Sequence, residues 1–191
     1  MTGRSAQVTH GAAGARADGA GNLRVALLRG VNVGGVTVKS VPLADVFHEL
    51  GFTDVRTVLA SGNVLFAGDA GAAELAEAIA KALSAQFGYP ARVIVIDQAK
   101  VRDVLEAYPF DEVDDRQPYV VFVSQPGDIQ ALLDLAGELD DDVERVQPGD
   151  GVLYWEVRKG MSTNSTFSKR TAHTPGILTT TRNLRTLRKL L

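Results

Sequence analysis

Apolar residues recur with two different periods along the chain, and the order of these periods predicts the fold. The first regular element is a short apolar run at 23–28 (LRVALL), which is typical of a buried strand. A glycine-punctuated loop follows at 30–35. The remaining spacing of the first half predicts a helix around 43–50, a hairpin with strands at 55–59 and 64–66, a helix over 75–87 and a strand at 92–96.

The second half repeats this order after a linking helix at 101–108. Its spacing predicts a strand at 119–123, a helix over 129–136, strands at 143–146 and 152–157 around a turn, a Ser/Thr-rich stretch with weak helical character, and a last helix starting near Thr181. In that last helix the leucines at 184, 187 and 191 share one face, and the basic residues at 182, 185 and 189 share the other.

The order strand, helix, hairpin, helix, strand is the split βαβ arrangement of the ferredoxin-like fold. We therefore predict an α+β protein of two ferredoxin-like (βαββαβ) lobes, with antiparallel sheets that carry helices on one face. The expected lobes are residues 23–97 and 98–191, the second ending in a basic helix. Residues 1–22 are rich in Gly and Ala and have no periodic apolar pattern, so we expect them to be a disordered extension.

Composition excludes several functional classes. The 191 residues include no cysteine, which rules out disulfides, thiol catalysis and thiolate metal sites. The apolar runs are all shorter than the roughly 20 residues that a membrane helix needs. The net charge of −3 gives no overall attraction to nucleic acid or to anionic lipid. We expect a cytoplasmic protein, a monomer, with no metal and no cofactor.

The charge is unevenly distributed along the second half. Residues 97–156 contain sixteen acidic and four basic side chains, whereas residues 157–191 contain eight basic side chains and no acidic one. Two interpretations remain open. The two segments pack together and neutralise each other, or the basic segment meets an anion, with Arg182 and Arg185 as accessible ligands near the start of the last helix. The candidate caps of that helix are Thr179, Thr180, Thr181 and Asn183.

Three separated segments carry motifs that occur together in a known family. They are ALLRGVNVGG at 26–35, LGFTDVRTVLASGNVLF at 50–66 and TTTRNLRTLRKL at 179–190. In this combination the chain resembles, from Leu23 to its end, the bacterial family called domain of unknown function 1697, although that family typically has Trp where this chain has Leu184. The resemblance implies paired ferredoxin-like lobes in a single-chain cytoplasmic protein, and it implies no activity.

The glycine loop and the hairpin turn are the first candidate binding region. The loop lacks the Gly-Lys-Ser/Thr of a Walker A motif and the spacing of a dinucleotide fingerprint, so it is either a turn that needs positive φ or an anion site. The arginine at the strand end, Arg29, either binds a phosphate or carboxylate or pairs with a nearby acidic residue. In a ferredoxin-like lobe this loop and the turn leave the same sheet edge. Their backbone N–H groups form an anion nest there, or else the loops cap each other. The candidate ligand-binding residues are Arg29, Asn32, Gly34, Gly35, Ser61, Asn63, Arg182, Asn183 and Arg185.

Other chemistries find little support in the sequence. The histidines at 10, 48 and 173 have neither metal-ligand spacing nor a nucleophile elbow, and the acidic runs at 111–115 and 140–142 lack calcium-loop spacing. Tyr154 and Trp155 are the one evident pair for stacking on bases, and strand alternation places one of the two outward.

Two classes of function follow from these observations. The first is a binding protein for an anionic, phosphate-bearing ligand or, with weaker support, nucleic acid. The second is an enzyme that acts on an anionic small molecule through Arg29, Asn32 and Arg182. A purely structural or protein-interaction role is a third possibility.

Overall fold

The computed structural model describes residues 22–31, 38–59, 62–172 and 174–191. The first lobe contains β1 (Leu23–Arg29), α1 (Ser40–Glu49), β2 (Thr53–Val58), β3 (Asn63–Ala67), α2 (Ala72–Phe87) and β4 (Arg92–Asp97). The second contains β5 (Arg116–Val123), α4 (Asp128–Ala136), β6 (Glu144–Gly149), β7 (Val152–Arg158), α5 (Thr166–Thr171) and β8 (Thr179–Asn183). Two further helices, α3 (Gln98–Glu106) and α6 (Leu184–Arg188), lie outside these repeats. The sequence-based boundary between the lobes falls between β4 and α3.

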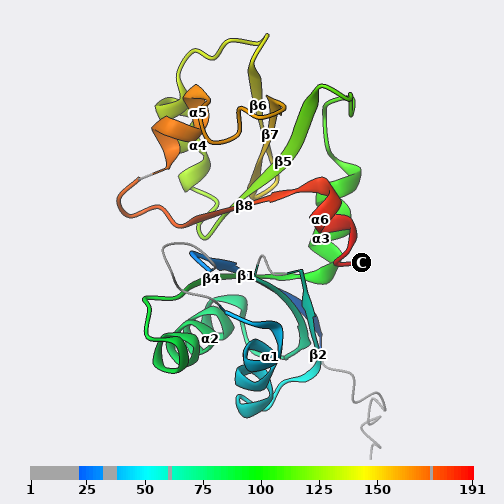
Figure 1. Cartoon of the computed structure of the whole chain (residues 1–191), viewed down its shortest axis with the longest axis vertical. Helices are drawn as coiled ribbons and strands as arrows, with labels where there is room; N and C mark the ends of the chain where they lie inside the picture. Colours follow the sequence, from blue (N-terminus) through cyan, green and yellow to red (C-terminus); the bar gives the residue numbers. More distant parts are fainter. Residues whose placement is uncertain (1–21, 32–37, 60–61, 173) are drawn as a thin grey trace, which may run out of the picture.

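Both lobes have the same sheet topology. The strand orders are β2-β3-β1-β4 and β6-β7-β5-β8, and every neighbouring pair is antiparallel. This is the ferredoxin-like order, so the predicted fold class is confirmed. The two lobes stack one above the other (Figure 1). The helices α1 and α2 pack on one face of the first sheet, and α4 and α5 pack on one face of the second.

The buried parts of β1 and β5 are continuous apolar runs because both faces of each strand are covered there. In β1, Ala26 and Leu28 pack against α1 and α2, whereas Val25 and Leu27 face the other lobe. In β5 the same division separates Val121 and Val123 from Val120 and Phe122, which face the first lobe. Near-continuous apolar runs are the sequence signature of strands buried on both faces.

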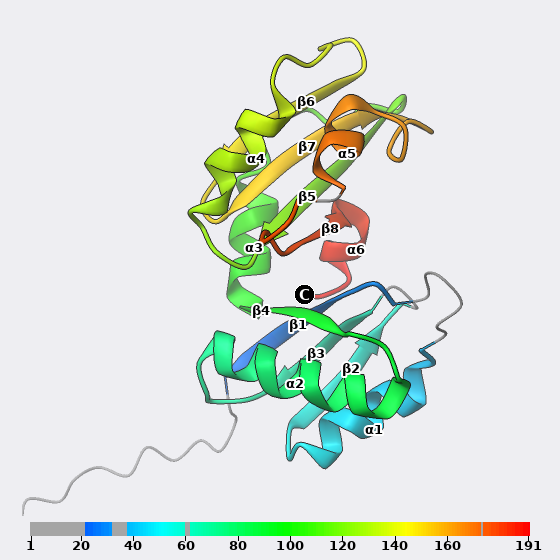
Figure 2. The same ribbon diagram turned by 90° about the vertical axis from the view of Figure 1, so that its left-hand side faces the viewer.

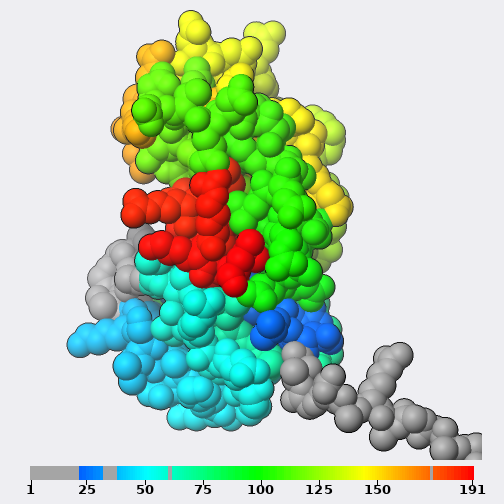
Figure 3. Space-filling view, turned by 90° about the vertical axis from the view of Figure 1, so that its right-hand side faces the viewer, coloured from blue at the N-terminus to red at the C-terminus, as the bar shows by residue number. Residues whose placement is uncertain are grey.

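One hydrophobic cluster joins the two lobes. It combines inward residues of both sheets with α3 and α6, and Leu184, Leu187 and Leu190 are at most 1% exposed within it. Figure 2 shows α3 and α6 between the sheets, and Figure 3 shows the C-terminal segment seated beside α3 where the lobes meet. The lobes therefore share a core, which the last helix fills through Leu184 and Leu187 as predicted, whereas the predicted Leu191 is 48% exposed and Leu190 is buried in its place.

The beginning of the last element was predicted wrongly. Residues 179–183 form a strand, β8, and not the first turn of a helix; the helix begins only at Leu184. The run Thr179-Thr180-Thr181 is β-branched and pairs with β5, for example Thr181 with Val121. The leucine spacing predicted the helix correctly from Leu184 onward, but it carried no information on where the helix begins. A smaller difference is that β6 continues through Pro148 and Gly149, which were expected in a turn.

The expected outward aromatic on β7 is also absent from the surface. Tyr154 is 3% exposed in the core shared by the lobes, and Trp155 is 4% exposed in the core of the second lobe. Strand alternation does place the two rings on opposite faces of the sheet. Since another layer covers each face of the sheet, neither ring is displayed for base stacking.

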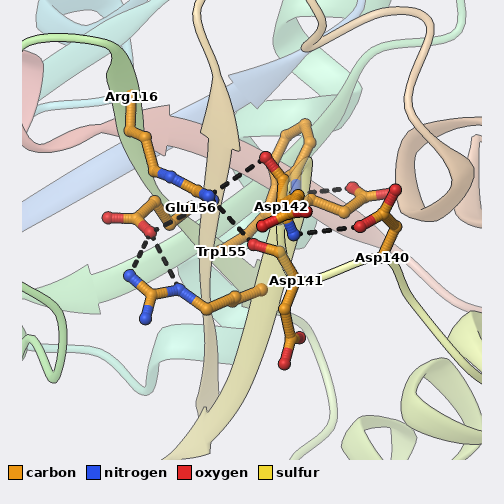
Figure 4. A network of polar contacts seen from close by, with 8 residues as sticks. Arg116, Asp140, Asp141, Asp142, Trp155 and Glu156 are labelled. Carbon is orange, nitrogen blue, oxygen red and sulfur yellow. Dashed lines mark hydrogen bonds and ion pairs between the residues drawn. The ribbon is translucent and has the colours of Figure 1, made fainter.

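Part of the acidic excess is neutralised inside the second lobe. Glu156 is 1% exposed and accepts hydrogen bonds from Arg145 Nε at 3.0 Å and Nη2 at 2.5 Å, while Arg116 Nη1 lies 3.5 Å away (Figure 4). Arg116 also donates to the backbone oxygens of Asp141 and Asp142. Between the acidic segment and the basic C-terminal segment, the described residues include one ion pair, Arg188 with Glu112 on the surface.

Candidate anion-binding cavity between the lobes

The three motif segments of the sequence meet where the two sheets approach each other. The segments are the end of β1, the turn that precedes β3, and β8, and Arg182 joins them. Its Nε donates to Asn63 Oδ1 at 2.6 Å, and its Nη2 donates to Leu28 O at 2.7 Å and Gly62 O at 3.3 Å. A single side chain of the second lobe thus holds two loops of the first.

The same guanidinium is anchored within its own strand. Arg182 Nη1 donates to Thr180 Oγ1 at 2.7 Å and to Thr181 O at 2.9 Å. All five N–H donors of the guanidinium therefore have acceptors in the protein. Arg182 is 9% exposed, and burial lowers its pKa to about 10, which leaves it charged at neutral pH. The sequence-based hypothesis treated Arg182 as an accessible side chain, whereas the structure uses its donors to connect the lobes.

Asn63 and Asn183 also have defined positions. Asn63 is fully buried and donates to Val58 O at 3.0 Å while it accepts from Arg182. Asn183 caps α6, because its Oδ1 accepts from Thr186 N at 2.7 Å. Both side chains fix backbone geometry around the motif.

The two loops expected at one sheet edge do come together. Leu28 N donates to Gly62 O at 2.8 Å, and a Cβ atom added to Gly62 would lie 2.5 Å from Val31 Cγ2. Gly62 has φ +72°, so the close approach and the backbone both require glycine there. Asn32, Gly34, Gly35 and Ser61 lie outside the described residues.

A cavity of about 350 Å³ opens beside Arg182, between the end of β1 and the second lobe. Its polar lining consists of two arginines and five hydroxyl side chains: Arg29, Arg182, Ser168, Thr171, Thr179, Thr180 and Thr181. Among the described residues that line it, none carries a carboxylate. The volume is within the range of small-molecule sites.

Unlike Arg182, Arg29 has N–H groups that are not used in hydrogen bonds to other described residues. It is half-buried at the end of β1, and its Nη2 donates to Ala172 O at 3.3 Å. A guanidinium has five N–H donors. Among the described residues this long bond is the one hydrogen bond that Arg29 makes, so its remaining N–H groups are able to bind a further acceptor.

Aromatic side chains form the inner wall of the cavity. Trp155 and Phe167 line it with ring centroids 5.4 Å apart, and Tyr119 stacks on Trp155 at 4.9 Å. Buried Glu144 fixes this wall: its Oε2 accepts from Trp155 Nε1 at 3.0 Å and its Oε1 from Phe167 N at 2.9 Å. Both carboxylate oxygens of Glu144 therefore accept hydrogen bonds from residues of the aromatic wall.

A second, more open cavity of about 410 Å³ adjoins the first. Arg29 and Ala172 line both cavities, and the second adds Arg92 at the start of β4 together with residues 174–177. Arg92 is not among the candidate residues predicted from the sequence. Strand alternation was the feature of the sequence that could have identified it. Arg92 lies on the same face of β4 as Ile94 and Ile96, which pack in the core between the lobes.

Arg185 and His48 lie away from these cavities. Arg185 is exposed on α6, and no hydrogen bond or ion pair joins it to another described residue. His48 is exposed on α1. The described residues include no group of three or more His, Asp or Glu side chains arranged to hold a metal ion, and none of their helices has the length and apolar character needed to span a membrane.

Comparisons with known proteins agree with the fold. No curated protein matches the chain. The structure is similar to that of the conserved bacterial protein SP0830 from Streptococcus pneumoniae, with a TM-score of 0.71 and 21% identity over 88% of this chain and 96% of that one. At this identity the likeness shows a shared fold. A family profile described as protein of unknown function (DUF1697) matches residues 22–154, which ends before the C-terminal motif expected to belong to the match. Since the match spans more than half of the chain, this protein belongs to the DUF1697 family.

Proposed function

We propose that this protein binds a small anionic, phosphate-bearing molecule in the cavity between its lobes. The observation that carries the proposal is the lining of the cavity, which combines Arg29 and the charge of Arg182 with five hydroxyl side chains and, among the described residues, no carboxylate. Charge-assisted hydrogen bonds from a guanidinium are the stronger kind, and threonine hydroxyls add donors for phosphate oxygens.

Binding is favoured over catalysis by the same residues. None of the described lining residues is a His, Asp, Glu, Lys or Tyr, the usual side chains for general acid–base work. A recessed cavity also suits a small molecule better than a nucleic acid, which binds through an exposed basic surface. With these lining residues, an enzyme acting on the same anion is the weaker candidate.

Trp155 provides a direct test, because it is the one tryptophan in the chain and lines the cavity. We expect one or a few phosphorylated metabolites from a small library to change its fluorescence saturably and to raise the melting temperature. Loss of charge-assisted hydrogen bonds in Arg29→Ala should weaken such a ligand by roughly ten- to a hundredfold.

Arg56→Ala is the matched control, since Arg56 is an exposed arginine on β2, the opposite edge strand of the first sheet from β4. It should bind like the unmodified protein. Equal binding by Arg29→Ala and the unmodified protein would contradict the proposal. The proposal would also be contradicted if no anion in the library bound the protein saturably.

A further inference from the structure

Two arginines face each other across the strands at the mouth of the cavity. In the β1–β4 pair, Arg29 lies directly opposite Arg92. Directly opposed residues of antiparallel strands point to the same face of the sheet. Both side chains accordingly line the more open cavity, on the face toward the second lobe.

We propose that Arg29 and Arg92 form a two-arginine clamp for the doubly charged group of the ligand, a terminal phosphate or a diphosphate. This inference rests on the proposed function and deepens it, because it assigns the position and the charge of the ligand's anionic end. The clamp lies where the two cavities adjoin, so the rest of the ligand extends into the cavity lined by Trp155.

The energetics of the sheet support a ligand at this place. Like charges directly opposite each other destabilise a pair of strands. The described lining of the open cavity consists of Arg29, Arg92, Ala172, Thr174, Pro175, Gly176 and Ile177, and no acidic side chain is among them to relieve the repulsion. Elsewhere on β1 an arginine does have such a partner, since Arg24 pairs with Asp97 at the other end of β4. A local arrangement that works against stability is expected at a functional site.

The charge of the ligand follows from the number of cations. A carboxylate carries one negative charge and is matched by one guanidinium. A phosphate monoester or a diphosphate carries about two or more charges at neutral pH and offers enough oxygens for two bidentate forks. The clamp therefore predicts selectivity for a phosphate-type anion over a monocarboxylate.

The test uses the full chain with inorganic pyrophosphate, inorganic phosphate and acetate at constant ionic strength, followed by calorimetric titration and thermal shift. We expect the unmodified protein to bind pyrophosphate and phosphate more tightly than acetate. Arg92→Ala should weaken pyrophosphate about tenfold and reduce its advantage over acetate, and Arg56→Ala should change neither. Without an anion, Arg92→Ala should melt at or above the temperature of the unmodified protein, because the repulsion is removed.

Each other result has a defined meaning. If Arg29→Ala weakens pyrophosphate and Arg92→Ala does not, the clamp is wrong and the proposed anion site stands. If Arg92→Ala melts at a lower temperature without an anion and binds normally, Arg92 is a structural residue and the clamp is again wrong. If the unmodified protein prefers acetate or binds none of the three anions, the clamp is overturned, and the library titration with Trp155 then decides the proposed function separately.

Discussion

At the scale of single residues, the buried guanidinium of Arg182 holds the three motif segments together. Arg182 is bonded to Asn63 and Leu28, which lie 119 and 154 residues away in sequence. The sequence-based alternatives for this arginine were a carboxylate partner or a free ligand site. All five hydrogen bonds described above go to neutral oxygens, so within the described part of the chain these donors serve the contact between the lobes.

Arg182→Ala should destabilise the protein strongly. The change leaves a buried amide oxygen and buried carbonyls without their donor and opens a void, at a cost of about 3 kcal/mol. For a chain of this size that corresponds to a melting temperature roughly 6–12 °C lower. Thermal unfolding followed by circular dichroism measures it.

Arg185→Ala supplies the comparison from the neighbouring helix. Arg185 is exposed, so its removal should change stability by no more than about 0.5 kcal/mol. Similar melting temperatures for the two variants would refute the structural role of Arg182.

At the scale of elements, the contact between the end of β1 and the hairpin turn depends on one glycine. The topology placed these loops at one edge, and that expectation is met by the approach of Gly62 to Val31. A prediction from topology works here because it needs only the direction of each strand. It could not state the distance between the loops, which is set by side-chain packing.

Gly62→Ala should cost more stability than Gly30→Ala. Both glycines have positive φ, +72° and +77°, and alanine is strained at either by roughly 1–2 kcal/mol. At Gly62 the added Cβ would also lie 2.5 Å from Val31 Cγ2, whereas nothing lies within 4 Å of it at Gly30. The clash should add about 1–3 kcal/mol in urea unfolding. Equal losses in the two variants would show that the loops do not pack as described.

At the scale of the whole molecule, the core shared by the two sheets makes the lobes interdependent. Val25 and Leu27 of the first lobe and Val120 and Phe122 of the second belong to one buried cluster with α3 and α6. Each inner sheet face is covered by the other sheet together with α3 and α6, and not by the helices of the two βαββαβ repeats. Separation would expose apolar surface at a cost of about 25 cal/mol per Å².

We therefore expect the protein to unfold in a single cooperative transition. Fluorescence of Trp155 reports on the second lobe, and far-ultraviolet circular dichroism reports on both. The two signals should give the same midpoint in urea, as two-state unfolding requires. A fluorescence midpoint distinct from that of circular dichroism would mean that the lobes unfold independently.

The sequence by itself determined the two ferredoxin-like lobes, most of the strands and helices, and the convergence of the glycine loop with the hairpin turn. These follow from local information, because the periods of 2 and 3.6 report which faces of an element are buried. Two of the family motifs, at 26–35 and 179–190, contribute residues 28–31 and 179–182 to the lining of the cavity.

Only the tertiary structure decided what the individual arginines do. The burial of Arg182, the opposition of Arg29 and Arg92 and the start of β8 depend on strand register and on packing between the lobes. Residues far apart in sequence make these contacts, and no period in one segment carries information about its partner. The same reason hides both Tyr154 and Trp155, since alternation assigns a residue to a face and only the assembled layers show whether that face is covered.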